Sequence, residues 1–305
     1  MKIAICGIGA VGGYFGGLLA KKFQNSSDVE IYFIARGENE KAIQKSGLQL
    51  FTTKGDYTAH PKLTTSDTAL IGPVDLLICS TKSFSLQESI LQCASCINSD
   101  TIILPLLNGV DSRQIISKIY PSNHVCDGCV YLIARLTEPG IVRETGNVSK
   151  LFFGSEDNSG ERLQNILEVF RQAGIEAQLS DNIQQVMWEK FVFISSIATL
   201  TAYLDDSIGS ILSDTNKKSM LTSLLTEIKS LADKKNISLP QNIIQITLDK
   251  LSSLPYETTS SMHSDFKKGK LTELESLTGY VVRAAKDLAV QVPVFERMYY
   301  ALKNR

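Results

Sequence analysis

The chain has 305 residues, of which 43% are hydrophobic, and its 31 basic and 32 acidic residues nearly cancel. This length predicts about two domains with substantial cores, and the balanced charge argues against nucleic acid or an anionic membrane surface as a partner. No apolar run reaches the roughly 18 to 20 residues that a membrane-spanning helix needs, so we expect a cytoplasmic protein with no membrane association.

The first seventeen residues predict a nucleotide-binding turn. Lys2 to Cys6 is an apolar run of strand length, a G-x-G-x-x-G pattern starts at residue 7, and apolar residues then recur at helical spacing. Gly7 permits the tight turn, Gly9 lets the backbone approach a pyrophosphate, and Gly12 lets the helix lie close on the strand. The helix N-terminus adds unpaired N–H groups and partial positive charge. The residues expected to bind the cofactor here are Gly7, Ile8, Gly9, Ala10, Val11 and Gly12.

Two other interpretations of this segment compete with a nucleotide site. A signal peptide is disfavoured because four glycines among residues 7–13 suit an apolar helical core poorly, and no A-x-A-like site precedes Lys21 and Lys22. A glycine-rich turn without a ligand is the other alternative. The strand before the turn and the helix after it favour the nucleotide site.

The end of the second predicted strand, Val29 to Ile34, indicates which cofactor binds. A dinucleotide fold that prefers NAD carries an acidic residue here, for the ribose 2′-OH. This chain has Arg36 instead, and a guanidinium suits a 2′-phosphate through charge and bidentate geometry. We therefore expect NADP(H); the alternative is an ordinary solvated arginine at a strand end.

Two further strands end in polar residues. Val74 to Cys79 leads to Lys82, and Thr101 to Leu104 leads to Asn108. Ligands bind at the carboxyl ends of strands in open α/β sheets, so both residues are candidates, although either could be an ordinary loop residue. Between the first strands, Glu38 to Ser46 is predicted to be a helix and residues 47–63 a surface excursion with strand-like pieces.

The spacing of four cysteines superficially matches a zinc site, Cys93-x-x-Cys96 with Cys126-x-x-Cys129. A zinc site needs all four thiolates to converge. The first pair falls in a helical pattern and the second in a strand-like run, where residues three apart point to opposite faces. We expect free, mostly buried thiols in a reducing compartment and no metal.

The composition changes near Asp181, where we place the domain boundary, with domains 1–180 and 181–305. The preceding elements are predicted to be strands at 125–135, 140–143, 150–154 and 175–179 and a helix at 160–173. The second domain reads as helical throughout. The predicted fold class is therefore α/β, with an N-terminal Rossmann-type doubly wound sheet and a C-terminal all-α domain.

The second domain opens with a helix, from Val186 to Leu204, that is apolar almost all round and should be buried. Its Lys190 either reaches water or sits partly desolvated, in which case it is the better proton donor. Further helices are predicted at 216–236, 239–251 and from 272 to about 290. Glu273, in the first turn of the last of these, could simply complement the helix dipole.

Taken together, these motifs resemble the ketopantoate reductase family (2-dehydropantoate 2-reductases) over nearly the whole chain. The matching segments are GIGAVGGYFG at 7–16, IARG at 34–37, the Lys82 segment, LNGV at 107–110, WEKF at 188–191, and Ser261-Met262 followed twelve residues later by Glu273 in TELE. The resemblance implies reduction of 2-dehydropantoate to (R)-pantoate by NADPH, on the route to coenzyme A. A homodimer is possible.

The resemblance also implies a role for each matched residue. Lys190 would protonate the oxygen formed as hydride reaches the C2 carbonyl. Glu273 would orient Lys190 and contact a substrate hydroxyl, and Ser261 would hold the substrate carboxylate. Asn108 would position Lys190 and the nicotinamide ribose, and Lys82 would line the cleft near cofactor and substrate. These implied roles place the active site in a cleft between the two domains.

Two positions depart from the best-known family members. Those carry asparagines four and eight residues after the catalytic lysine, where this chain has Ile194 and Ala198, whose side chains form no hydrogen bonds. Ser195 or Ser196 could compensate, although they project from different faces of a helix. Two alternatives to ketopantoate reduction therefore stay open: reduction of a different, more apolar 2-oxo acid, and a non-catalytic NADP(H)-binding regulator.

Overall fold

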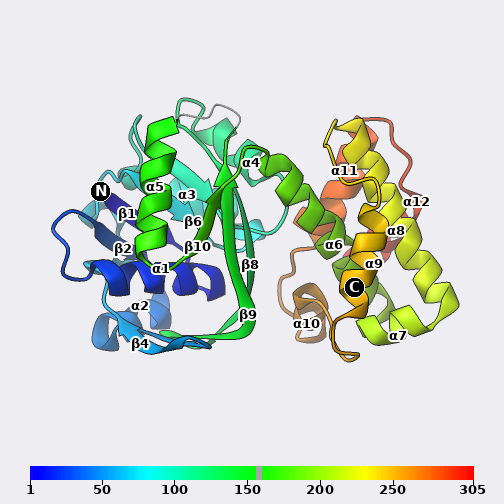
Figure 1. The fold of residues 1–305 in the computed structure, drawn as a ribbon, viewed down its shortest axis with the longest axis horizontal. Helices are drawn as coiled ribbons and strands as arrows, with labels where there is room; N and C mark the ends of the chain where they lie inside the picture. The colour runs from blue at the N-terminus through cyan, green and yellow to red at the C-terminus, as the bar shows by residue number, and fades with distance from the viewer. Residues whose placement is uncertain (156–159) are drawn as a thin grey trace. The chain divides into compact units, whose positions relative to one another are not determined.

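The computed structural model describes residues 1–155 and 160–305, which form two compact units (Figure 1). The first comprises Met1–Leu107 and Asp111–Ile183, and the second comprises Asn108–Val110 and Gln184–Arg305. The strands of the first unit are β1 (Lys2–Cys6), β2 (Glu30–Ile34), β3 (Leu48–Thr52), β4 (Gly55–Ala59), β5 (Leu63–Thr65), β6 (Leu76–Cys79), β7 (Ile102–Pro105), β8 (Asp127–Glu138), β9 (Ile141–Gly154) and β10 (Glu176–Leu179). Its α-helices are α1 (Ala10–Phe23), α2 (Gly37–Ser46), α3 (Leu86–Gln92), α4 (Ser112–Ile119) and α5 (Gly160–Gln172), with short 3₁₀ turns at Thr68–Leu70, Ser83–Ser85 and Ala94–Cys96.

A parallel sheet in the order β5-β2-β1-β6-β7 is the centre of the first unit. Ile3 of β1 lies opposite Ile31 on one side and Leu76 on the other. Because β1 is central and covered on both faces, its residues are apolar in succession rather than alternately. The chain adds strands outward from β1, first on one side and then on the other. Because β1 and β6 are parallel, their carboxyl ends lie at the same edge of the sheet.

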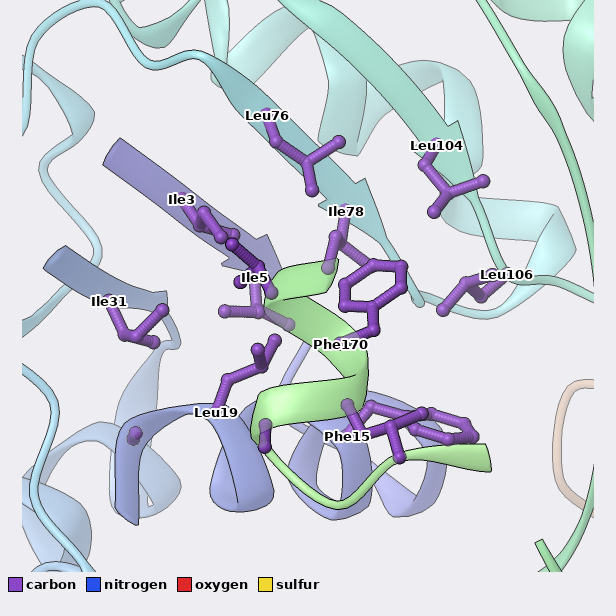
Figure 2. Close-up of a cluster of buried hydrophobic side chains, with 14 of the residues drawn as sticks. Ile3, Ile5, Phe15, Leu19, Ile31, Leu76, Ile78, Leu104, Leu106 and Phe170 are labelled. Carbon is purple, nitrogen blue, oxygen red and sulfur yellow. The ribbon is translucent and has the colours of Figure 1, made fainter. Parts of the chain in front are cut away.

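Helices cover both faces of this sheet. Ile3 and Ile5 face a core formed with α1 and α5, whereas Ala4 and Cys6 face a second core formed with α3 and α4. Figure 2 shows the first of these cores, in which sheet side chains meet Phe15 and Leu19 of the neighbouring helix α1 and Phe170 of α5, far away in the sequence. The predicted Rossmann-type doubly wound domain is confirmed.

A second, mixed five-stranded sheet was not predicted. Its order is β10-β9-β3-β4, with β8 paired to β9. The surface excursion expected at 47–63 is wrong, because β3 and β4 form a hairpin whose Leu48, Leu50 and Ala59 are buried. The strands expected at 140–143 and 150–154 are one strand, which passes through Gly146; a Cβ there would lie 3.0 Å from Cβ of Ile133 on the neighbouring strand.

All six cysteines are free and buried, as expected. Cys93 and Cys96 lie in the core on the α3 side of the parallel sheet, whereas Cys126 lies in the core on the opposite side. The four thiols of the zinc-like pattern therefore do not converge. Burial raises the pKa of Cys96 to about 11 and that of Cys126 to about 12, so both are protonated at neutral pH.

The second unit is helical, as predicted. Its elements are α6 (Ile183–Leu204), α7 (Ile208–Ser213), α8 (Thr215–Lys234), α9 (Ile243–Ser252), α10 (Ser261–Lys267), a π-helical segment (Glu275–Gly279), α11 (Tyr280–Asp287) and α12 (Pro293–Lys303). The long helix α6 (Figure 1) buries Trp188 and Phe191, which pack edge-on against each other and against Tyr280. Among the described helices, none is both long and apolar enough to cross a membrane.

Candidate functional site

The turn between β1 and α1 has the features of a phosphate-binding site. Gly9 caps α1 without a side-chain hydrogen bond, and the first turn of the helix has no acidic residue. The amide of Gly13 donates to the carbonyl of Gly9 at 2.9 Å, and this is the first hydrogen bond of the helix. The N–H groups of Ala10, Val11 and Gly12 precede it, so they have no carbonyl partner within the helix. These N–H groups and the helix dipole favour an anion.

The three motif glycines have different surroundings. Gly7 has φ +91°, and a Cβ there would lie 2.8 Å from the Thr81 amide nitrogen. A Cβ on Gly12 would lie 2.2 Å from both the Gly7 carbonyl oxygen and Ser80 Oγ, so this position tolerates no side chain. Around Gly9, by contrast, nothing lies within 4 Å of the added Cβ. The open space is therefore at the glycine expected to face a pyrophosphate, so the turn fits a dinucleotide.

Two polar side chains that the sequence analysis missed support this turn. Ser80 Oγ donates to the Gly7 carbonyl at 2.9 Å. Asn39 Nδ2 donates to the Ile8 carbonyl at 2.7 Å, and Asn39 Oδ1 accepts from the Gly140 amide at 2.7 Å. The position of Ser80 directly after a strand was a usable signal. No local pattern marks Asn39, whose partner Gly140 is about a hundred residues away.

The cationic candidates of the first unit lie at the carboxyl ends of its strands. Lys82 is exposed two residues beyond Ser80, whose amide donates to the Cys6 carbonyl at 2.9 Å, so its loop lies beside the glycine turn. Arg36 precedes α2 and is 71% exposed, with Nη1 3.9 Å from Glu88 Oε1. An exposed guanidinium in this place is available to a 2′-phosphate.

The second unit brings Lys190, Asn108 and Glu273 together. Lys190 Nζ donates to Asn108 Oδ1 at 2.9 Å, and Asn108 Nδ2 donates to Glu273 Oε2 at 3.5 Å. Lys190 is half-buried and Glu273 is 5% exposed. Glu273 therefore has a side-chain partner in addition to any interaction with the helix dipole. The Asn108 amide lies between an ammonium and a buried carboxylate.

Packing against α6 positions the segment that follows Glu273. Ser195 Oγ donates to the Leu277 carbonyl at 3.1 Å, and Thr199 Oγ1 shares a 2.7 Å hydrogen bond with Thr278 Oγ1. Both partners lie in the π-helical segment, and segments of this kind are often found at functional sites. The same helix that presents Lys190 thus also fixes the segment that leads from Glu273.

Ser261 lies elsewhere on the second unit. It is the exposed first residue of α10, and its hydroxyl makes no hydrogen bond within the part of the chain that the structure describes. The hydroxyl of its neighbour Ser260 meets Thr201 Oγ1 at 2.8 Å, eleven residues after Lys190 on α6. At about 1.5 Å per residue, this places α10 about 16 Å along α6 from Lys190.

The face of α6 between these two points is apolar. Ile194 is partly exposed and Ala198 is buried, one and two turns after Lys190. The suggestion that Ser195 or Ser196 replaces a missing asparagine is wrong, because both are fully buried and Ser195 is bonded to Leu277. The Ser196 hydroxyl has no partner among the described residues.

The arrangement of Lys190 suits proton donation. Lys190 Nζ, held by the Asn108 amide, is placed to stabilise negative charge that develops on a nearby oxygen atom. Proton transfer then needs only hydrogen-bonding distance. The glycine turn and Arg36, in the other unit, suit a phosphorylated dinucleotide.

Comparisons with known proteins cover nearly the whole chain. The model of the family described as "Ketopantoate reductase PanE/ApbA" matches residues 3–158, and the corresponding C-terminal model matches residues 182–305. The structure resembles 2-dehydropantoate 2-reductase from Porphyromonas gingivalis W83, with a TM-score of 0.87, 34% identity and 99% of each chain covered. It also resembles a D-mandelate dehydrogenase solved with NADH and anilino(oxo)acetate, with a TM-score of 0.85, 26% identity, and 100% and 98% of the two chains covered. An oxidoreductase of Bacillus subtilis, YkpB, is 26% identical over 99% of this chain and 98% of its own.

Proposed function

Because the chain belongs to the ketopantoate reductase PanE/ApbA family, we propose that it reduces 2-dehydropantoate to (R)-pantoate with NADPH. The observation that supports this most directly is the Lys190–Asn108–Glu273 cluster. We assign dinucleotide binding to the unit that carries the glycine turn and Arg36. Substrate binding is assigned to the helical unit. The carboxylate lies next to the C2 carbonyl, so for Ser261 to hold it, α10 would have to move toward Lys190 when the substrate binds.

The proposed reaction needs a hydride and a proton. NADPH, when bound, supplies the hydride to the C2 carbonyl carbon. Lys190 donates a proton to the carbonyl oxygen as negative charge develops there, and the amine later regains a proton from solvent. Asn108 Oδ1 holds the ammonium, and Glu273 fixes the Asn108 amide through its Nδ2. These two hydrogen bonds fix the position of Lys190 Nζ, the atom that donates the proton.

The cofactor preference has a direct test. Arg36→Ala should weaken NADPH binding about 10- to 100-fold, because a charge-assisted contact to the 2′-phosphate is lost, and should change NADH binding less than twofold. Titration of the purified protein with each reduced cofactor gives both dissociation constants. Equal weakening of the two would show that Arg36 does not contact a 2′-phosphate.

A second substrate class is favoured by one observation. The partly exposed Ile194 lies one turn after Lys190 on α6, and a substrate hydroxyl placed against it would lose its hydrogen bonds to water without replacement. A 2-oxo acid with an apolar side chain avoids that cost. The relative solved with anilino(oxo)acetate is named a D-mandelate dehydrogenase, which agrees with this alternative.

A panel of substrates decides between these two candidates. If ketopantoate is the substrate, its kcat/KM with NADPH should exceed that of 2-oxo acids bearing branched or aromatic side chains by at least tenfold, an advantage of about 1.4 kcal/mol in transition-state binding. NADPH oxidation at 340 nm measures each value. A reversed order would assign the apolar substrate class, and no oxidation with any member would contradict a reductase.

A further inference from the structure

We infer that Glu88 weakens the preference for NADPH by opposing the 2′-phosphate at Arg36. The inference rests on the proposed dinucleotide site. Glu88 Oε1 lies 3.9 Å from Arg36 Nη1, and the two side chains are 65% and 71% exposed. An exposed pair of this kind adds little to folding stability. The effect that we consider is therefore on the affinity of a cofactor bound at Arg36.

The position of Glu88 is defined by its own helix. Glu88 lies in the first turn of α3, and Gln92 Nε2, one turn later, donates to the same Oε1 atom at 3.0 Å. The acidic residues of α2 next to Arg36 are engaged elsewhere: Glu38 pairs with Lys41 at 2.8 Å, and Glu40 accepts from the Ser66 amide at 2.9 Å. Among the described residues, Glu88 is thus the carboxylate within ion-pair distance of Arg36.

This contact affects the two cofactors differently. A 2′-phosphate bound to Arg36 meets a second negative charge at Glu88, and it must also displace the carboxylate from the guanidinium. A ribose 2′-OH carries no charge and can donate to the carboxylate, as acidic residues at this edge do in NAD-binding folds. Glu88 therefore costs NADPH affinity without costing NADH affinity. For charges about 7 Å apart in solvent at low ionic strength, the cost is about 3- to 8-fold in the dissociation constant.

The test compares Glu88→Gln, which keeps the shape and removes the charge, with the unsubstituted protein. Dissociation constants for NADPH and NADH are measured by nicotinamide fluorescence at about 20 mM and 200 mM salt, without substrate. Glu88→Gln should tighten NADPH binding about 3- to 8-fold at low salt and less at high salt, because screening weakens the repulsion, and should leave NADH binding unchanged or weaker. Glu168→Gln is the matched control, since Glu168 also pairs with an arginine, Arg171, at 3.0 Å on the exposed side of α5.

Three results would overturn the role of Glu88: unchanged NADPH binding at low salt, weaker NADPH binding, or an equal shift for both cofactors. Glu168→Gln should change neither constant, and a similar effect there would also count against a local role. If the unsubstituted protein binds neither cofactor, the dinucleotide site itself is wrong and the role of Glu88 falls with it. If the unsubstituted protein binds NADPH normally and Glu88→Gln leaves the ratio of the NADPH and NADH dissociation constants unchanged, only the role of Glu88 is rejected. The two failures are therefore distinguishable.

Discussion

Replacing Lys190 with alanine should lower kcat for 2-oxo acid reduction about 10²- to 10⁴-fold and leave NADPH affinity within about twofold of wild type. The ammonium is the proton donor in the proposed reaction, and Asn108 Oδ1 holds it at 2.9 Å. Alanine removes the donor without touching the glycine turn or Arg36. Steady-state kinetics and a cofactor titration on the same preparation measure the two effects.

Two further variants sharpen the test of Lys190. Asn108→Ala keeps the ammonium but removes the oxygen that holds it, so its loss of kcat should be smaller than that of Lys190→Ala. Lys229→Ala is the control, because Lys229 is a lysine on another helix of the same unit, α8, paired with Asp233 at 2.7 Å. Its kcat should be unchanged. A Lys190→Ala protein with full activity would contradict proton donation, and an intact biological output without catalysis would favour the NADP(H)-binding regulator.

Gly9→Ala should weaken NADPH binding, whereas Gly12→Ala should lower the stability of the fold. A methyl group on Gly9 meets nothing within 4 Å, so the protein should fold with a free energy of unfolding within about 1 kcal/mol of wild type. The same methyl group occupies the space assigned to the pyrophosphate, and NADPH binding should weaken about 10- to 100-fold. On Gly12 it would lie 2.2 Å from the Gly7 carbonyl oxygen and from Ser80 Oγ, which should cost about 3 kcal/mol of stability.

Denaturant unfolding and cofactor titration separate these effects. Gly160→Ala is the matched control for Gly9→Ala, because a Cβ on Gly160, the first residue of α5, also meets nothing within 4 Å. That variant should keep both stability and NADPH affinity. Unchanged NADPH affinity in Gly9→Ala would mean that phosphates do not approach this turn. A stable Gly12→Ala protein would mean that α1 can move away from β1.

The parts of the fold that could be predicted are those set by local sequence. β1, the glycine turn and α1 follow one another within about twenty residues, and each has its own signal in hydrophobic spacing or in glycine. The apolar helix α6 was predictable for the same reason. The second sheet was not, because the pairing of Gln49 with Ile141 joins strands about ninety residues apart, and neither strand indicates its partner.

In the candidate site, too, features set by local sequence were predictable and contacts between distant residues were not. The position of Lys190 on a buried helix was predictable, but whether its ammonium reaches water or meets a partner was not. That depends on Asn108, which is 82 residues earlier in the chain, and on Glu273, which is 165 residues after Asn108. Resemblance to a family, rather than residue spacing, linked these three positions. Glu88 and Asn39 carried no signal, because their contacts depend on how separate helices pack.

The π-helical segment at Glu275–Gly279 affects how the sequences of related chains align in this stretch. A π turn holds one residue more than an α turn. Because a π turn takes up its extra residue within one turn, a chain with one residue fewer here can form an ordinary α turn and keep Glu273 and α11 in nearly the same places. In related chains, the placement of gaps across this segment therefore determines which acidic residue is equivalent to Glu273.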